Sequence, residues 1–208
     1  MTVKIKICGV TRAGDAALAA ALGADYIGLN FWPGSKRFVS VEEGREIAAA
    51  IPAGTRKVGV FVNAEPADVE HVALMVGLDL VQLHGDETPD DCAALSIPWM
   101  RALRIGGAAD LDAIALYPGA QAILLDAPSP GYGGSGRRVD WGLAAAAHDR
   151  GKPIFLAGGL NPENVGDAIR AARPFAVDVA GGVESAPGIK DETALSRFID
   201  AARRGDPA

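Results

Sequence analysis

The chain has 208 residues, of which 49% are apolar, and its formal net charge at neutral pH is −6. This length and apolar content suffice for one sizeable hydrophobic core, so we expect a single domain over residues 1–208. The acidic balance argues against a general nucleic-acid binder, although a local basic site for a phosphorylated substrate is compatible with it. No apolar stretch reaches the length of a membrane span or of a signal-peptide core, so we expect no membrane partner.

The two cysteines, Cys8 and Cys92, do not form a C-x-x-C pair. Two cysteines alone do not make a disulfide framework, and we expect free thiols in a reducing compartment, hence a cytoplasmic protein. The sequence shows no histidine–carboxylate cluster with metal-ligand spacing and no G-x-G-x-x-G dinucleotide motif after its first predicted strand. These patterns indicate no metal site.

In chain order, short β-branched or apolar runs alternate with alanine-rich helical stretches. The predicted strands are residues 3–10, 26–31, 56–62, 80–84, 99–105, 122–126, 153–157 and 175–180. The predicted helices are residues 15–22, 41–50, 66–76, 89–95, 110–116, 141–149, 162–172 and 192–203. Ser40 is a candidate N-cap, Pro162 a candidate first helical residue, and Gly23, Gly77 and Gly151 follow helix ends, where left-handed residues are common.

Eight βα units predict parallel strands with right-handed crossovers and a sheet covered by helices. We expect them to close into an α/β fold of the (β/α)8 or TIM-barrel class, with an open doubly wound sheet as the alternative. Active sites of such barrels lie at the C-terminal ends of the strands. The polar residues at those ends are Cys8, Asn30, His84, Asp126 and Asp178.

Cys8 ends a strand in which alternation places Lys4, Lys6 and Cys8 on one face. A nearby cation lowers the pKa of a thiol, so we expect Lys6 to favour the thiolate of Cys8, which would then act as a base or nucleophile. The alternative is a small buried apolar side chain, the commoner state of a free cysteine. Cys92 falls within a predicted helix and is expected to be inert.

Asp126 follows four apolar residues, and packing explains a carboxyl group there poorly. Partial burial would suit it to general acid catalysis, whereas the alternative is a loop residue that caps the next turn. His84 shares a strand face with Gln82 and either lines the barrel mouth or is structural. His71 and His148 fall on predicted helices and are expected at the surface.

Glycine-rich turns follow the sixth, seventh and eighth predicted strands and can bind phosphate through backbone N–H groups. The candidate phosphate-binding residues are Gly134, Ser135, Gly158, Gly159, Gly181 and Gly182. Arg37, in the loop after the second predicted strand, can hold a carboxylate in a two-point clamp or can be a solvated loop charge.

Segments along nearly the whole chain resemble the phosphoribosylanthranilate isomerase family. They are residues 6–9 (KICG), 35–39 (SKRFV), 59–63 (GVFVN), 82–87 (QLHGDE), 124–126 (LLD), 133–136 (GGSG), 156–165 (LAGGLNPENV) and 182–191 (GVESAPGIKD). The chain departs from the family pattern at Lys36, at Ser135, at Val139 and at the Ala180-Gly181-Gly182 segment. The last change removes two hydroxyl groups from the expected phosphate site and leaves backbone contacts possible.

The resemblance implies a TIM barrel that catalyses an Amadori rearrangement of N-(5-phosphoribosyl)anthranilate in tryptophan biosynthesis. It implies Asp126 as the general acid, Cys8 as the general base and Arg37 as the contact of the anthranilate carboxylate. We also expect His84 and Asp178 to contact the substrate and Lys6 to tune the thiol. This chemistry needs no cofactor.

Three other functions compete with this interpretation. A sugar-phosphate isomerase of the histidine-pathway type uses two aspartates, which Cys8 disfavours. A lyase or aldolase needs a Schiff-base lysine, for which Lys6 is the only candidate. A non-catalytic phosphate-sugar binder needs neither Cys8 nor Asp126. The sequence leaves a monomer and a homodimer equally open.

Overall fold

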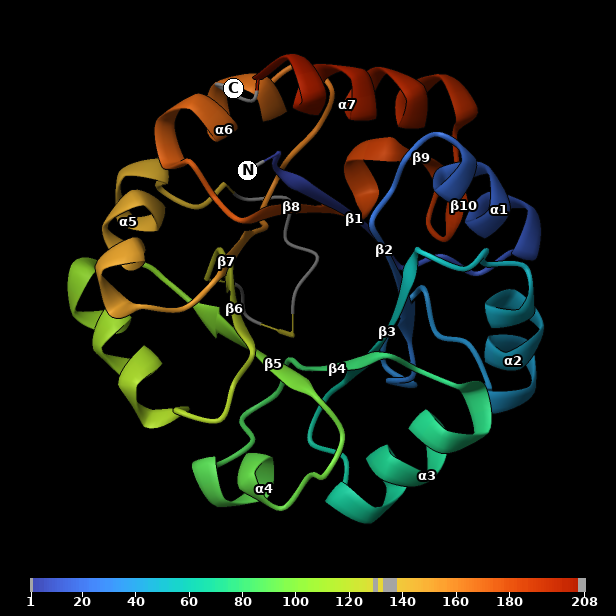
Figure 1. The fold of residues 1–208 in the computed structure, drawn as a ribbon, viewed down its shortest axis with the longest axis horizontal. Helices are drawn as coiled ribbons and strands as arrows, with labels where there is room; N and C mark the ends of the chain where they lie inside the picture. The colour runs from blue at the N-terminus through green and yellow to red at the C-terminus, as the bar shows by residue number, and fades with distance from the viewer. Residues whose placement is uncertain (1, 129–130, 133–137, 206–208) are drawn as a thin grey trace.

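The computed structural model describes residues 2–128, 131–132 and 138–205, and within them eight parallel strands form a closed barrel in the order β1 to β8 (Figure 1). The strands are β1 (Lys4–Cys8), β2 (Tyr26–Asn30), β3 (Arg56–Phe61), β4 (Leu80–Leu83), β5 (Trp99–Arg104), β6 (Ala122–Asp126), β7 (Ile154–Leu156) and β8 (Ala176–Val179). β1 closes the ring by pairing with β8, with Ile5 opposite Val177. The predicted barrel is therefore confirmed, and the open sheet is excluded.

Helical segments surround the barrel on its outside (Figure 1). They are α1 (Ala13–Ala21), α2 (Val41–Ala49), α3 (Pro66–Val76), α4 (Pro89–Ala93), η1 (Ala108–Leu116), α5 (Trp141–Ala146), η2 (Ala147–Arg150), α6 (Val165–Ala172) and α7 (Glu192–Gly205). The short 3-10 helix η3 (Gly181–Val183) follows β8. No described helix has both the length and the apolar character that crossing a membrane requires.

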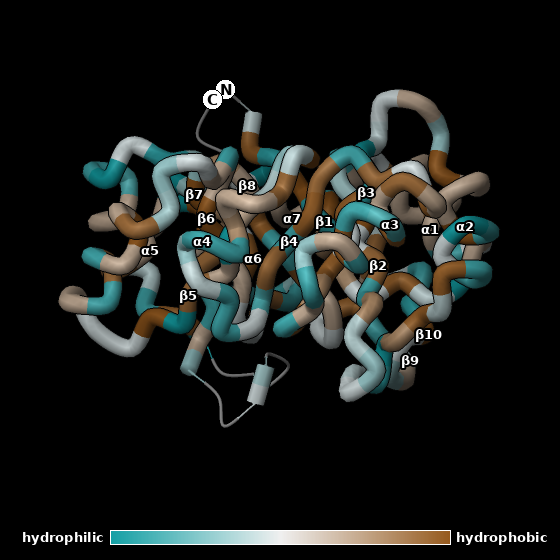
Figure 2. The backbone as a smooth tube through the Cα atoms, turned by 90° about the horizontal axis from the view of Figure 1, so that it is seen from below, coloured by the Kyte–Doolittle hydropathy of each residue, from teal (hydrophilic) through white to brown (hydrophobic). Residues whose placement is uncertain are grey.

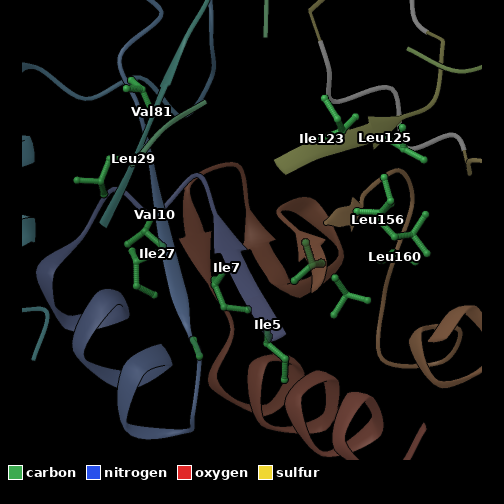
Figure 3. Packing of buried hydrophobic residues seen from close by; sticks show 14 of the residues in the cluster. Ile5, Ile7, Val10, Ile27, Leu29, Val81, Ile123, Leu125, Leu156 and Leu160 are labelled. Carbon is green, nitrogen blue, oxygen red and sulfur yellow. The ribbon is translucent and has the colours of Figure 1, made fainter. Parts of the chain in front are cut away.

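Alternating residues of each strand supply two separate apolar layers. Outward side chains such as Ile5, Ile7 and Leu125 are fully buried against the surrounding helices, as Figure 3 shows. Inward side chains such as Met100 and Phe155 fill the barrel interior. Figure 2 shows hydrophobic stretches of the tube in the strands and also in the surrounding helices. Each fully buried large apolar side chain contributes about 1.5–3 kcal/mol.

Local signals in the sequence explain several helix boundaries. Ser40 forms a capping box with Glu43, in which the Ser40 hydroxyl accepts from the Glu43 N–H at 3.2 Å and the Glu43 carboxylate accepts from the Ser40 N–H at 2.8 Å. Gly23, Gly77 and Gly151 all have positive φ, as expected for residues that follow helix ends. Side-chain capping and glycine thus fix these boundaries as predicted.

Other boundaries differ from the prediction. Helix α6 begins at Val165 and not at Pro162, because the Asn161 side chain accepts from the N–H groups of Glu163 and Asn164 and holds the segment as a turn. The segment after β5, predicted as an α-helix, is the 3-10 helix η1. A two-stranded hairpin of β9 (Glu184–Ala186) and β10 (Ile189–Lys190) after β8 was not predicted.

Candidate active site

The C-terminal ends of the strands open into a cavity of about 650 Å³. Polar or glycine residues from at least four strand ends and their loops meet there. The predicted site residues that line it are Cys8, Arg37, His84, Asp126, Gly158, Gly159, Asp178, Gly181 and Gly182. Gly134 and Ser135 lie outside the described residues. The structure therefore brings the remaining candidates together, apart from Lys6, which lies buried below the cavity.

Cys8 lies at the end of β1, above an ion pair whose lysine is fully buried. Lys6 is 0% exposed, and its ammonium donates to Asp178 of β8 at 2.7 Å. Burial tends to lower the pKa of Lys6, but Asp178 and Cys8 outweigh this effect and raise it. The pairing with Asp178 favours the cationic form of Lys6, which disfavours the Schiff-base role required of a lyase.

The expected thiolate is only partly supported by these surroundings. Burial raises the pKa of Cys8 most strongly, and the negative charge of Asp178 raises it further. Lys6 and Lys190 lower the pKa of Cys8, as predicted for Lys6, but the net shift is upward. Burial and Asp178 thus oppose the thiolate that Lys6 is expected to favour, whereas Lys6 itself shifts the pKa of Cys8 in the expected direction.

Asp126 lies at the end of β6, and its side chain is 13% exposed. One carboxylate oxygen accepts from the N–H of Ala127 at 2.8 Å, and the other is 3.4 Å from Nε2 of His84. Nδ1 of His84 is 2.9 Å from Nε2 of Gln82, a buried side chain of β4. A donating Gln82 amide would place the ring proton of a neutral His84 on Nε2, facing Asp126.

Arg37 is not a solvated loop charge. Its Nε and Nη2 donate to the two carboxylate oxygens of Glu184 at 2.8 and 2.7 Å. The two-point clamp predicted for a ligand carboxylate is thus made to Glu184, whose Oε1 also accepts from the buried Lys190 at 2.8 Å. Among the described residues, Nη1 of Arg37 makes no hydrogen bond, and the side chain borders the cavity.

The glycine turns after β7 and β8 pack directly against each other. Gly158 and Gly159 have φ values of 82° and 61°, a left-handed conformation that favours glycine. A Cβ on Gly182 would lie 2.0 Å from the carbonyl oxygen of Leu160, so that only glycine fits at this contact. Asn164 donates to the carbonyl of Gly159 at 2.9 Å and fixes the first turn. Two adjoining backbone segments thereby border one side of the cavity.

Several residues of the site were not predicted from the sequence. Trp32 and Tyr132 line the cavity from the loops after β2 and β6, and their rings meet edge to face at 5.6 Å between centroids. Glu184 and Lys190 belong to the unpredicted hairpin. The segment 182–191 matched a family motif, and that match was the only sequence signal for these two charges.

The remaining cysteine and histidines lie away from the cavity. Cys92 is fully buried in α4, and burial raises the pKa of its thiol to about 11, in accord with an inert residue. His71 is exposed on α3, and His148 lies in η2, where its Nε2 is 2.7 Å from the carbonyl oxygen of Ala172.

Comparison with known proteins gives a consistent result. The family model of N-(5'-phosphoribosyl)anthranilate isomerase matches residues 5–201. The N-(5'-phosphoribosyl)anthranilate isomerase of Pseudomonas putida is 48% identical over 204 residues, which cover 97% of this chain and 98% of the relative. The phosphoribosyl anthranilate isomerase structure from Thermotoga maritima is 43% identical, with a TM-score of 0.91 and coverage of 97% of this chain and 98% of that chain.

A second solved structure of this isomerase contains reduced 1-(o-carboxyphenylamino)-1-deoxyribulose 5-phosphate. It is 40% identical, has a TM-score of 0.88, and the match covers 97% of this chain and 98% of that chain. The family model matches most of the chain, and the relatives are similar over almost their whole length. Together these two findings identify the family of this chain. The chain belongs to the N-(5'-phosphoribosyl)anthranilate isomerase family, whose members are aldose–ketose isomerases of tryptophan biosynthesis.

Proposed function

We propose that this chain converts N-(5-phosphoribosyl)anthranilate into 1-(2-carboxyphenylamino)-1-deoxyribulose 5-phosphate, with Asp126 as general acid and Cys8 as general base. The observation that carries the proposal is that the carboxyl group of Asp126 and the thiol of Cys8 border one cavity. They come from β6 and β1, which are separated by β7 and β8 around the barrel. A ligand in the cavity can therefore meet an acid and a base on different sides.

Asp126 acts in the first step, which opens the ribose ring. Its carboxyl group donates a proton to the ring oxygen while the bond between that oxygen and C1 breaks. The lone pair of the anthranilate nitrogen forms the new C=N bond, which gives a protonated Schiff base. The Asp126 side chain is short, and the hydrogen bond from the Ala127 N–H holds its carboxyl group in place. This suits Asp126 to a proton transfer at one defined position.

Cys8 acts in the second step, which moves a hydrogen from C2. Its thiolate takes the C2 proton, and the released electron pair neutralises the Schiff base to give an enolamine. Tautomerisation of the enolamine gives the ketone. Because burial and Asp178 raise the pKa of Cys8, Lys6 and Lys190 act as the counter-charges that stabilise the thiolate when it forms.

The remaining candidates bind the substrate. The N–H groups of Gly158 and Gly159 donate to no backbone acceptor within the described residues, and Gly181 and Gly182 form the start of η3, where N–H groups lack partners within the helix. We assign these four groups to the phosphate. Gly134 and Ser135 remain predicted phosphate contacts. We assign His84 and Asp178 to the ribose hydroxyls, because both side chains line the same cavity as the acid and the base. Arg37 is assigned to the anthranilate carboxylate.

Loss of the fluorescence of freshly made phosphoribosylanthranilate tests the proposal. We expect rapid loss with the wild-type protein and near-complete failure of Cys8→Ser and Asp126→Asn. Cys92→Ala and Asp112→Asn serve as matched controls, since Cys92 lies away from the cavity and Asp112 is an exposed carboxylate paired with Arg150. Wild-type protein without turnover overturns the reaction, and an active Cys8→Ser variant overturns the assigned base.

We infer in addition that residues 1–208 act as one catalytic domain in the cytoplasm. The family match over residues 5–201 supports the single domain. Whether the active form is a monomer or a homodimer is decided by sedimentation of the purified protein at micromolar concentration. Limited proteolysis that releases an active shorter piece would contradict the single-domain assignment.

A further inference from the structure

A chain of charges, buried at Glu184 and Lys190, links Arg37 to the backbone of Cys8. Arg37 pairs with Glu184, and Glu184 pairs with Lys190. The ammonium of Lys190 in turn donates to the carbonyl oxygen of Cys8 at 2.6 Å. The residue assigned to the substrate carboxylate and the residue assigned as base are thus joined through two side chains of the β9–β10 hairpin.

The orientation of the Arg37 guanidinium is fixed on several sides. Two of its five N–H donors are taken by Glu184 in a parallel two-bond arrangement. Its aliphatic stem crosses Gly9, where a Cβ would lie 2.2 Å from Cδ of Arg37, and its Nη2 lies 3.2 Å from the position of a Cβ on Gly181. The N–H donors of Nη1, which make no hydrogen bond among the described residues, are therefore held in a fixed orientation at the border of the cavity.

The charges along this chain leave one net positive charge. Arg37 and Lys190 count as +1 each and Glu184 as −1; burial lowers the pKa of Lys190, and the pairing with Glu184 opposes this effect. Arg37 holds down the pKa of Glu184, as does Lys190, although burial opposes them. Lys190 has an acceptor for each of its three N–H donors in Cys8, Ala180 and Glu184, as an ammonium group requires. Lys190 thus offsets the charge of Glu184 and leaves that of Arg37 available to a ligand anion.

We propose that Glu184 and Lys190 are positioning residues that hold Arg37 for the aromatic carboxylate of the substrate at a fixed place relative to Cys8. The inference rests on the proposed function of the same site. In this arrangement Glu184 supplies orientation, and Lys190 prevents Glu184 from cancelling the charge of Arg37. If Glu184 merely neutralised the charge of Arg37, its removal would strengthen binding of the carboxylate. If Glu184 orients Arg37, its removal weakens that binding, so the direction of the change in affinity distinguishes the two explanations.

Two ligands test the proposal without turnover. One is the reduced product analogue that carries the ring carboxylate, and the other is the same compound without that carboxylate. Glu184→Gln keeps the size of the side chain but presents one acceptor oxygen instead of two. We expect it to weaken the carboxylate ligand about tenfold and to leave the carboxylate-free ligand within about twofold, by calorimetric titration. Asp112→Asn is the control, and both of its affinities should equal those of the wild type.

A double-mutant cycle with Arg37→Ala shows whether Glu184 acts through Arg37. We expect Glu184→Gln to have little further effect in the Arg37→Ala background. Tighter binding of the carboxylate ligand by Glu184→Gln, equal weakening of both ligands, or additive effects in the cycle would each overturn the proposal. Unchanged affinity of the carboxylate-free ligand shows that the variant is folded.

Lys190→Met tests the second part of the proposal. It leaves the charge of Glu184 opposed by Arg37 alone, so carboxylate binding should weaken even though Arg37 is present. The double variant Glu184→Gln with Lys190→Met removes the uncompensated anion and should regain part of that loss, whereas a loss that persists in full overturns the role of Lys190. All these experiments measure equilibrium affinities. They therefore test the positioning of Arg37 separately from the proposed reaction, whose failure would appear as absent turnover by the wild-type protein.

Discussion

The two sides of the catalytic cavity differ in how their charges are compensated. Around Cys8 the side chains of Lys6, Asp178, Glu184 and Lys190 form ion pairs that are almost completely buried. Around Asp126 the contacts are a backbone N–H and His84, and no described lysine or arginine pairs with its carboxylate. The group that must become an anion to act thus lies near two lysines, each paired with a carboxylate, whereas the group that must donate a proton has no lysine or arginine partner among the described residues.

The largest effect on catalysis is expected on the Cys8 side of the cavity. Lys6→Met removes the buried cation nearest to Cys8 and leaves the negative charge of Asp178, so the pKa of Cys8 should rise further. We expect kcat/KM at pH 7 to fall about a hundredfold and to recover partly at higher pH, measured in the fluorescence assay. Lys4→Met is the control, because Lys4 lies on the same strand but forms a half-exposed pair with Asp25. A loss independent of pH would contradict the role of Lys6 in tuning the thiol.

The pH dependence follows from the direction of the Cys8 shift. Burial and Asp178 raise the pKa of Cys8 above its ordinary value of 9.0, so the fraction of Cys8 present as thiolate, and with it the contribution of the base to kcat/KM, should rise about tenfold per pH unit from pH 6 to 8. Asp178→Asn removes an anion that raises this pKa, and its profile should shift to lower pH even if its maximum falls. A profile that shifts to higher pH would show that Asp178 acts on the thiol in another way.

A smaller effect is expected at the glycine turns. A methyl group at Gly182 would lie 2.0 Å from the carbonyl oxygen of Leu160, so Gly182→Ala must separate the two turns assigned to phosphate. We expect KM to rise about tenfold, with kcat less affected, because phosphate contributes binding in both ground and transition states. Gly14→Ala is the matched control, since a Cβ there meets no atom within 4 Å. An unchanged KM would place the phosphate elsewhere.

The smallest effect is expected on the side of Asp126. Gln82→Leu removes the hydrogen-bond partner of Nδ1 in His84 but keeps the barrel interior filled. We expect kcat to fall about threefold, with the alkaline rise of the pH profile unchanged, because no charge near Cys8 is altered. Inhibition by the reduced product analogue, measured in parallel, should stay the same. A displaced alkaline limb would show that the two sides of the cavity are coupled.

Much of the fold was predictable because its determinants are local. Alternation of strands and helices indicated the barrel, and Ser40 and Gly77 mark helix ends by their own hydrogen bonding and backbone conformation. The start of α6 was mispredicted because Pro162 is typical of a first helical residue, whereas the hydrogen bonds of Asn161 determine the turn. The β9–β10 hairpin has only five strand residues and carries no alternation long enough to detect.

The sequence by itself determined the barrel and the strand ends that carry Cys8 and Asp126, because a polar residue after a buried strand is a local signal. Only the tertiary structure decided how the charges are paired. Lys6 meets Asp178 across 172 positions of sequence, and Arg37 meets Glu184 across 147. Such pairs depend on the closure of β1 against β8 and on the hairpin that follows β8. The pKa of Cys8 is set first by burial and then by this pairing, so its direction could not be read from the neighbouring Lys6 alone.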